Sequence, residues 1–309
     1  MAEADFLMLG SWIAASLRSA TPLLLVMLGE TLTQRTGIIN LGVEGEMLMG
    51  ACIGFAVAAT TGDPLLGLLA GALAGAALST VHSGLVLGAK ANQIGSGLAV
   101  WMIGLGVTSY FGRGYVGGKV SPFLPLGAHI DGGPAFIHAI LDQITWTAPA
   151  ALGLAVIAGL WLYRTRTGLA WRTVGESAEV ARALGLRPLW VRLQAILTGG
   201  FFAGLGGAIL SVDYTQTWAQ DITKGKGLVA VGLVIVARWN PFLVIPTALL
   251  FGLSETSVLK LQAGGVAISP SLLATVPYVF AILVVVLAQS QGSRNAAMPA
   301  DLTAIFRKH

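Results

Sequence analysis

The chain has 309 residues, of which 55% are hydrophobic and 10% are charged, whereas soluble domains usually carry about 25% charged residues. So few charges exclude a water-covered surface, and the recurring apolar runs predict an all-α, polytopic membrane protein. The net charge of +4 does not indicate a nucleic-acid-binding protein, because the basic residues are distributed as in a membrane protein. The single Cys52 excludes an internal disulfide framework.

Nine apolar runs are candidates for membrane-spanning helices. A helix needs roughly 20 apolar residues to cross the hydrocarbon core, or somewhat fewer where neighbouring helices bury it. The candidate spans are residues 20–36, 43–61, 65–88, 92–111, 146–163, 192–212, 228–238, 242–257 and 272–290. We therefore expect residues 1–309 to form one transmembrane domain of about nine helices, with longer loops at 112–145 and 164–191.

The basic residues predict the orientation of the chain, because cytoplasmic loops carry an excess of Lys and Arg. With the C-terminus inside, twelve basic residues fall on the inner side and six on the outer side. The inner twelve are Arg35, Lys90, Arg164, Arg166, Arg172, Arg182, Arg187, Arg192, Arg238, Arg294, Arg307 and Lys308. An odd number of crossings then places the N-terminus outside, loop 112–145 outside and loop 164–191 in the cytoplasm.

Two spans carry small residues at helical spacing. These are Gly67, Gly71 and Gly75 in one span and Gly200, Gly204 and Ala208 in another. Small residues on one face let membrane helices approach closely, where the hydrophobic effect cannot drive their association. We interpret both sets as packing faces.

The stretch "ETLTQRTGIINLGVEGE", residues 30–46, places many polar side chains between two long apolar runs. Thr21 and Pro22 upstream form a helix-start signal, and Gly37 is typical of the position just beyond a helix end. A helix from Pro22 to about Thr36 would have some 15 residues and measure roughly 22 Å. That is too short for a comfortable crossing.

Beyond this point, Asn40 is placed to cap a second helix, with Glu44 and Glu46 in its first turns, where acidic groups complement the helix dipole. The stretch thus predicts a broken helix near residues 36–42. Irregular backbone at membrane depth is tolerated where protein buries it or where it lines a cavity, as in transporter sites. The alternative is a short inner turn whose charges, including Arg35, face water.

The second informative stretch is "ESAEVARALGL", at the centre of the loop 164–191. Its acidic residues come first and an arginine follows, which favours a helix, and Gly185 is a stop signal. A short helix at the cytoplasmic surface suits docking onto a soluble partner. The alternative is a solvated loop that obeys the positive-inside rule.

The chain contains no complete sequence motif for nucleotide or metal binding. "GRGYVGGKV" resembles a phosphate-binding loop, but Arg113 stands where the motif requires glycine and Val120 where it requires a hydroxyl. The four histidines, His82, His129, His138 and His309, form no i, i+4 pair of metal ligands. We interpret His82 as hydrogen-bonded packing, and we predict neither an enzyme nor a metal site.

Four motifs together carry a resemblance to a known family: "GETLTQRTGIINLGVEGEMLMGA", "TGLAWRTVGESAEVARALGL", "GLGGAIL" and "ARWNP". The chain resembles, over about residues 17–290, the permease subunits of ABC importers in the branched-chain amino acid, ribose and nucleoside superfamily. "GIINLGVEG" looks like the nucleoside-type branch, since the sugar branch tends to carry an aspartate where Asn40 stands. Ala237 departs from the glycine that relatives often have before "RWNP".

The resemblance implies a bacterial plasma (inner) membrane subunit that imports nucleosides by alternating access. Implied partners are an ABC ATPase, a second and related permease chain, and an extracytoplasmic substrate-binding protein. ATP and Mg²⁺ would be bound by the ATPase, with no cofactor on this chain. The stretch 175–185 matches the coupling helix that docks on the ATPase, with Glu176 taking a basic partner, Arg182 an acidic one and Gly185 ending the helix.

Polar side chains in apolar spans are candidates for the substrate pathway, since a nucleoside needs hydrogen-bonding groups and a stacking surface. The candidates are Glu30, Gln34, Asn40, Glu44, Asn92, Gln93, Ser96 and, for stacking, Trp101. Helix spacing lets one face hold Asn92 and Ser96 together. Helix capping is the alternative for Asn92 and Gln93, and packing or lipid contact is the alternative for Trp101.

One more acidic residue lies within an apolar span. Glu255, near the outer end of its span, is placed to pair with Lys260. An ion pair of this kind would be structural rather than part of the substrate pathway.

Nucleoside import has two alternatives. The first is the same machine with a sugar or another small polar solute as substrate. The second is a stand-alone secondary transporter, which would need no ATPase.

Overall fold

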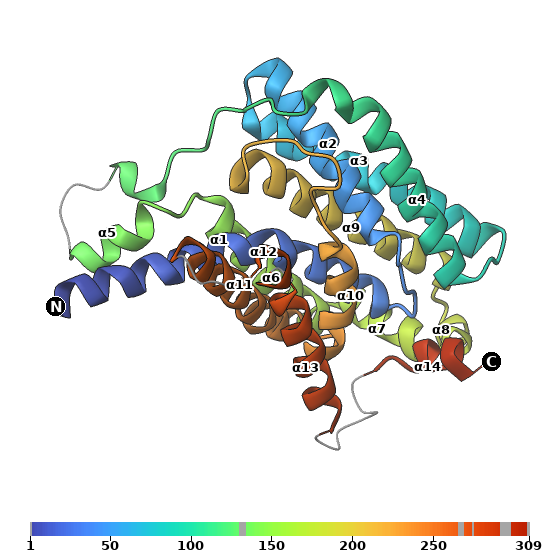
Figure 1. The fold of residues 1–309 in the computed structure, drawn as a ribbon. Coiled ribbons are helices and arrows are strands. Elements are labelled where there is room, and N and C mark those ends of the chain that lie inside the picture. Colours follow the sequence, from blue (N-terminus) through green and yellow to red (C-terminus); the bar gives the residue numbers. More distant parts are fainter. Residues whose placement is uncertain (1, 130–133, 265–268, 274, 291–297, 308–309) are drawn as a thin grey trace.

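The computed structural model describes the whole chain except residues 1, 130–133, 265–268, 274, 291–297 and 308–309. Arg294, Lys308 and His309 therefore lie outside the described residues. The described part is helical and has no β-strand, with one isolated bridge between Lys119 and Thr217. The N-terminus and α5 lie at one side of the molecule and α7, α8 and α14 at the other (Figure 1).

The helices are α1 (Ala2–Gln34), α2 (Val43–Thr61), α3 (Pro64–Ser83), α4 (Gln93–Phe111), α5 (Ala135–Leu141), α6 (Thr147–Arg164), α7 (Arg166–Glu176), α8 (Ala178–Ala183), α9 (Pro188–Ile209), α10 (Lys226–Val236), α11 (Pro241–Ala263), α12 (Pro270–Leu273), α13 (Val276–Ser290) and α14 (Ala300–Arg307). A π-helical turn extends α3 through Gly84–Gly88, and another extends α9 through Leu210–Tyr214.

Within the described residues, seven helices are long and apolar enough to cross a membrane. They are Phe6–Gln34, Val43–Thr61, Pro64–Gly88, Gln93–Tyr115, Thr147–Arg164, Pro188–Tyr214 and Pro241–Ala263. The two remaining predicted spans are shorter helices, since α10 has 11 residues and α13 has 15. The all-α polytopic class is therefore confirmed, whereas the count of nine full crossings is not.

The predicted helix start at Thr21 and Pro22 is wrong, because α1 continues through both residues. The Thr21 hydroxyl donates to the Leu17 carbonyl one turn earlier (2.7 Å) and so supports the helix from within. Proline is tolerated inside membrane helices where neighbouring helices pack around it, and here Gly206 of α9 lies against the Pro22 carbonyl. The first helix is consequently much longer than the 15 residues expected.

Side-chain caps fix where several spans begin. Asp63, Asn92 and Asn240 each accept a hydrogen bond from the backbone N–H two residues later, at 2.8, 2.9 and 3.0 Å. These bonds satisfy backbone donors that a helix start otherwise leaves unpaired. Asp63 and Asn240 also precede prolines at the first helical position, which reinforces the start.

The helices α2, α3 and α9 pack closely through the small residues identified in the sequence. A Cβ added at Gly204 would lie 2.9 Å from the Cα of Gly75, and one added at Gly71 would lie 2.6 Å from the Cβ of Ala208. On α2, a Cβ at Gly54 would lie 2.8 Å from the Cβ of Ala208. The predicted packing faces are confirmed.

We expect Gly204→Leu to prevent stable folding, because a side chain there would overlap the backbone of α3. Gly106→Leu on α4 is the matched control, since a Cβ at Gly106 meets nothing within 4 Å and leucine favours helix over glycine by up to about 1 kcal/mol. Size-exclusion chromatography of detergent-extracted protein should show a monodisperse peak for the control and loss of that peak for Gly204→Leu. Equal peaks would contradict this packing.

Candidate functional site

The break between α1 and α2 lies where the sequence predicted it. Helical geometry ends at Gln34 and resumes at Val43. Gly37 adopts a φ of +84°, a left-handed conformation that glycine reaches without a steric penalty.

Contacts with α9 show that the chain turns back into the bundle at this break. Arg192 on α9 donates from Nε to the Thr36 carbonyl (3.2 Å), and Gly207 on α9 lies against the Met47 carbonyl of α2. These two points on α9 are about 22 Å apart at 1.5 Å per residue. The first turn of α2 accounts for about 6 Å of that rise, so the irregular residues 37–42 cover the remainder.

Four side chains at the break form what we call the polar core: Glu30, Gln34, Asn40 and Glu46. Gln34 donates from Nε2 to Glu30 Oε1 (2.8 Å), and the backbone N–H of Asn40 donates to the same oxygen (3.2 Å). Asn40 donates from Nδ2 to Glu46 Oε1 (2.8 Å). None of the four is more than 3% exposed, so the alternative of a turn whose charges face water is wrong for these residues.

Neighbouring elements close around the polar core. The Trp239 indole, between α10 and α11, donates to Gln34 Oε1. Arg35 is half-buried and donates from Nε to the Trp239 carbonyl (2.6 Å). Gln93, at the start of α4, accepts from the backbone N–H of Ile39 (2.8 Å). The irregular backbone is thus hydrogen-bonded by protein from several sides, as membrane depth requires.

Asn40 does not cap α2 as predicted. Its Oδ1 accepts from the backbone N–H of Gly42 (2.9 Å), which closes a tight turn before the helix. The residue preceding α2 is Gly42, which has no side-chain cap. The predicted placement of Glu44 and Glu46 in the first turn of α2 is confirmed.

Glu46 belongs to the site although sequence reasoning placed it only at a helix start. Its Oε1 accepts from Asn40, while its Oε2 is buried without a hydrogen-bond partner among the described residues. The available signal was a third acidic residue within a short polar stretch, in a chain with so few charges.

Glu44 makes contacts that separate it from the polar core. Its Oε1 accepts from the Thr223 hydroxyl (2.6 Å) and the Gly225 N–H (2.8 Å), and its Oε2 accepts from the Gly227 N–H (2.6 Å). These donors surround the start of α10, where the helix dipole also favours a carboxylate. Glu44 therefore joins α2 to the first turn of α10.

The candidates on α4 do not form one group. Asn92 is exposed and caps the helix, as its alternative interpretation held, whereas Ser96 is buried and lies 3.1 Å from Nδ1 of His82. Asn92 thus stays at the exposed start of α4 while Ser96, one turn further on, reaches the interior, and the hydrogen-bonded role of His82 is confirmed. Trp101 is half-buried, packs its backbone against Gly45, and has a buried Nε1 without a hydrogen-bond partner in the described structure.

A second, partly buried polar group surrounds Glu255 on α11. Its carboxylate accepts from Lys226 Nζ (2.7 and 3.0 Å) and from the Ser19 hydroxyl. Lys260, the predicted partner, instead contacts the Ser11 hydroxyl (3.1 Å) and lies over the Trp12 ring. The prediction was wrong because the chain before α10 turns back into the bundle and carries Lys226 to Glu255.

Residues 176–190, which include α8, form what we call the docking element. The helix is shorter than predicted, because Ser177 caps it (Val180 N–H to Ser177 Oγ, 3.2 Å) and leaves Glu176 as the exposed last residue of α7. Arg182 is exposed in its last turn, and Gly185 follows with a φ of +79°.

The docking element presents apolar side chains to its surroundings. The exposed ones are Val180, Leu184, Leu189 and Trp190, and Leu184 reaches 68%. An exposed group of this kind, bordered by charged side chains, is typical of an interaction surface. This favours docking over a merely solvated loop.

The residues on either side of the docking element contact the break. Gly175, at the end of α7, lies against the carbonyl of Arg35, and a Cβ there would lie 3.3 Å from the Cα of Thr36. Arg192, at the start of α9, bonds the Thr36 carbonyl and forms an ion pair with Asp301 of α14. A displacement of α7 and α8 would therefore act on the backbone at the break.

Comparison with known proteins places the chain in a family. Residues 12–289 match the model of the branched-chain amino acid transport system permease component. The chain is 38% identical to the putative glucose ABC transporter permease protein TsgC13 of Haloferax volcanii, over 83% of this chain and 79% of that protein. It is 30% identical to the nucleoside ABC transporter permease protein NupC of Lactococcus lactis (89% and 91%). It is 29% identical to the guanosine ABC transporter permease protein NupQ of Bacillus subtilis (79% and 80%). No solved structure matches the chain.

Proposed function

The chain belongs to the family of branched-chain amino acid transport system permease components, and we propose that it is the membrane subunit of an ATP-driven importer of nucleosides. The chain is a multi-pass membrane protein of the ABC transporter permease class. The proposal adds the direction of transport, the substrate and the role of individual residues.

The observation that carries the proposal is that the residues on either side of the docking element, Gly175 and Arg192, contact the break. An ATPase subunit bound to the exposed apolar side chains of the docking element would move α7 and α9 as well. Gly175 and Arg192 touch the backbone of residues 35–36. Glu176 and Arg182 lie exposed on this element, where they offer one acidic and one basic contact to the partner.

The mechanism follows from this linkage. The partner ATPase binds ATP and Mg²⁺, and its closure displaces the docking element. ATP can shift the permease between two states only if the complex binds it with different affinity in each. The break and the polar core then reorganise, and the pathway opens to one side of the membrane at a time.

Two relatives support nucleosides as the substrate. NupC and NupQ are named for nucleoside and guanosine transport. In the structure the amide groups of Gln34 and Asn40 are bonded to Glu30, Trp239, Glu46 and Gly42, so they would meet a base or a hydroxylated sugar only after the break reorganises; Trp101 offers an aromatic face. The second candidate is a sugar, which the name of the more similar TsgC13 favours.

The proposal includes the topology and the partners. In this proposal the N-terminus lies on the outer side of a bacterial inner membrane, and the docking element lies on its cytoplasmic side. A second permease chain completes the transporter, and an extracytoplasmic binding protein delivers the substrate. Labelling of single cysteines in intact cells with a membrane-impermeant reagent tests the orientation: Leu184→Cys should be protected and Thr61→Cys, at the exposed end of α2, accessible.

We expect radiolabelled nucleoside uptake to require both the ATPase and the docking element. Uptake of guanosine, uridine, ribose and glucose is measured in cells with and without the neighbouring ATPase gene, and with Glu176→Ala/Arg182→Ala. We expect guanosine or uridine uptake to fall at least about 10-fold in the double variant, which corresponds to about 1.4 kcal/mol. Uptake of sugars alone would mean that the importer carries a sugar instead of a nucleoside. Uptake that is the same without the ATPase and in the double variant would mean that the chain is a secondary transporter.

A further inference from the structure

The segment from Trp218 to Gly225 runs back into the bundle before α10 begins. At its start, the backbone carbonyl of Trp218 accepts from the Gly117 N–H (3.4 Å). A Cβ at the neighbouring Gly118 would lie 3.4 Å from the Phe55 ring of α2. At its end, Gly225 donates to Glu44 in the first turn of α2. Phe55 and Glu44 are about 16 Å apart along α2 at 1.5 Å per residue. The segment therefore descends about half the thickness of a hydrocarbon core.

This re-entrant segment exposes polar side chains at membrane depth. Gln220, Asp221 and Lys224 are exposed, and Asp221 and Lys224 have φ values of +55° and +48°. Irregular backbone and charged side chains inside a bilayer occur where they meet protein or water, not where they meet lipid. The side of the bundle that carries this segment is consequently not a plain lipid-facing surface.

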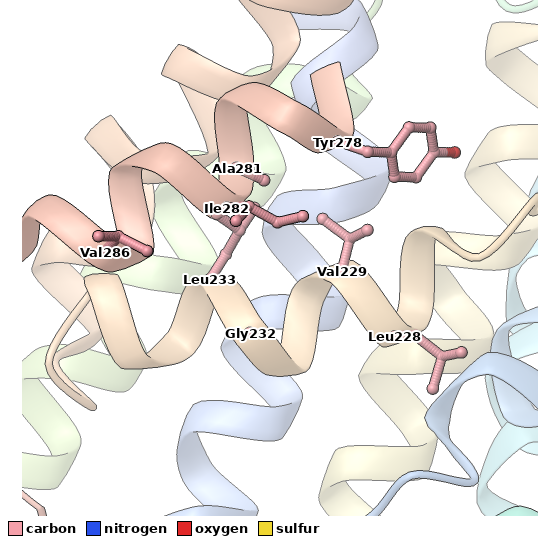
Figure 2. A pocket seen from close by; sticks show the side chains of 8 residues that line it. All are labelled: Leu228, Val229, Gly232, Leu233, Tyr278, Ala281, Ile282 and Val286. Atoms are coloured by element: carbon pink, nitrogen blue, oxygen red, sulfur yellow. The ribbon is translucent and has the colours of Figure 1, made fainter. Parts of the chain in front are cut away.

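Beside the segment, α10 and α13 enclose an apolar groove of about 400 Å³ (Figure 2). Its walls include Val229 and Leu233 of α10 and Ala281, Ile282 and Val286 of α13. The rim on α13 is open, because Ile282 is 64% exposed. The Tyr278 hydroxyl donates to the Lys224 carbonyl (2.8 Å) and so ties the groove to the re-entrant segment.

Over the residues that the structure describes, neither helix of the groove is long enough to cross the hydrocarbon core. At 1.5 Å per residue, α10 measures about 16 Å and α13 about 22 Å, against a core of about 30 Å. The apolar faces of α3 and α4 differ in this respect. Both belong to spans long enough to cross the membrane, 25 and 23 residues, and they expose Leu69, Leu73 and Met102 as ordinary lipid contacts.

We propose that the groove between α10 and α13, together with the re-entrant segment Trp218–Gly225, is the surface on which the second permease chain of the transporter packs. A soluble partner does not reach this depth, and lipid does not satisfy Asp221 and Lys224, so a second membrane-spanning chain, with the aqueous pathway between the two chains, accounts for both the groove and the segment. An apolar helix of that chain fills the groove, and the polar segments of the two chains face each other across the pathway. The inference rests on the proposed function in that it takes the transporter to contain two permease chains.

Site-specific photo-cross-linking tests this surface. The photoreactive residue p-benzoylphenylalanine replaces Ile282 or Val286 at the groove, or Leu69 or Met102 as matched controls on the exposed faces of α3 and α4. All four side chains are exposed, so the variants should fold. Each variant is expressed with the neighbouring permease, ATPase and binding-protein genes and irradiated in membranes. Adducts are identified by mass spectrometry, and guanosine uptake is measured in the same cells.

We expect adducts with a permease chain from Ile282 and Val286 and none from Leu69 and Met102. Permease adducts from the control positions alone, or lipid adducts alone from the groove, would overturn the inference. If either of these adduct patterns occurs in cells with ATPase-dependent guanosine uptake, the surface is refuted and the proposed function stands. Groove adducts with a permease in cells that lack ATPase-dependent uptake support the surface and refute the importer.

Discussion

Replacing Glu44 with alanine is expected to abolish transport and to lower the thermal stability of the protein. The Glu44 carboxylate accepts three hydrogen bonds from residues 223–227 around the start of α10, two of them from backbone N–H groups. A buried donor left without its acceptor costs about 1–3 kcal/mol, so the loss of all three amounts to several kcal/mol, a large fraction of a typical folding free energy. The start of α10 would detach from α2, and the re-entrant segment would lose its anchor.

The measurement compares uptake, normalised to surface expression, with the melting temperature in detergent. Glu44→Gln is the conservative control, because its amide oxygen still accepts from Gly225 while its NH₂ group faces the Gly227 donor. We expect Glu44→Gln to fall between the native protein and Glu44→Ala in both measurements. Native-like uptake by Glu44→Ala would show that the link between α2 and α10 is dispensable.

The break and the packing faces were predictable from sequence because their causes are local. Gly37 supplies a conformation that other residues avoid, and the polar run around it has no place on a lipid-facing helix. The spacing of Gly67, Gly71 and Gly75 likewise follows from helix geometry alone. Pro22 shows the limit of such signals. A Thr-Pro pair at a helix start and one inside a long helix look alike, and the contact with Gly206 that decides between them is distant in sequence.

The polar contacts could not be predicted, because chain segments far apart in sequence determine them. Glu44 was grouped with Glu30 and Asn40 by proximity in sequence, yet its donors come from residues 223–227. Glu255 was assigned to Lys260 on the next turns of the same helix, whereas the re-entrant segment brings Lys226 to it. Hydropathy marks which charges are buried, but the tertiary path of an irregular segment decides which of them meet.

Changing Asn40 to aspartate is expected to impair transport although the side chains are nearly the same size. The Oδ1 bond to Gly42 can persist, but Nδ2, which donates to Glu46, becomes an acceptor oxygen. A third buried carboxyl group then lies among Glu30 and Glu46 without its hydrogen-bond donor, which costs about 1–3 kcal/mol or more. We expect uptake to fall by about 10-fold or more, since 1.4 kcal/mol corresponds to a factor of ten.

The double variant Asn40→Asp/Glu46→Gln separates a broken hydrogen bond from a general intolerance of change at the polar core. It exchanges the amide and the acid, so the introduced glutamine amide can donate to the introduced aspartate, and the number of carboxyl groups returns to the native one. Uptake and melting temperature should therefore recover relative to Asn40→Asp, a coupling that independent sites would not show. Asn92→Asp is the matched control, because Asn92 is an exposed helix cap where aspartate serves equally well. Additive losses in the double variant would mean that the Asn40–Glu46 bond does not maintain the break.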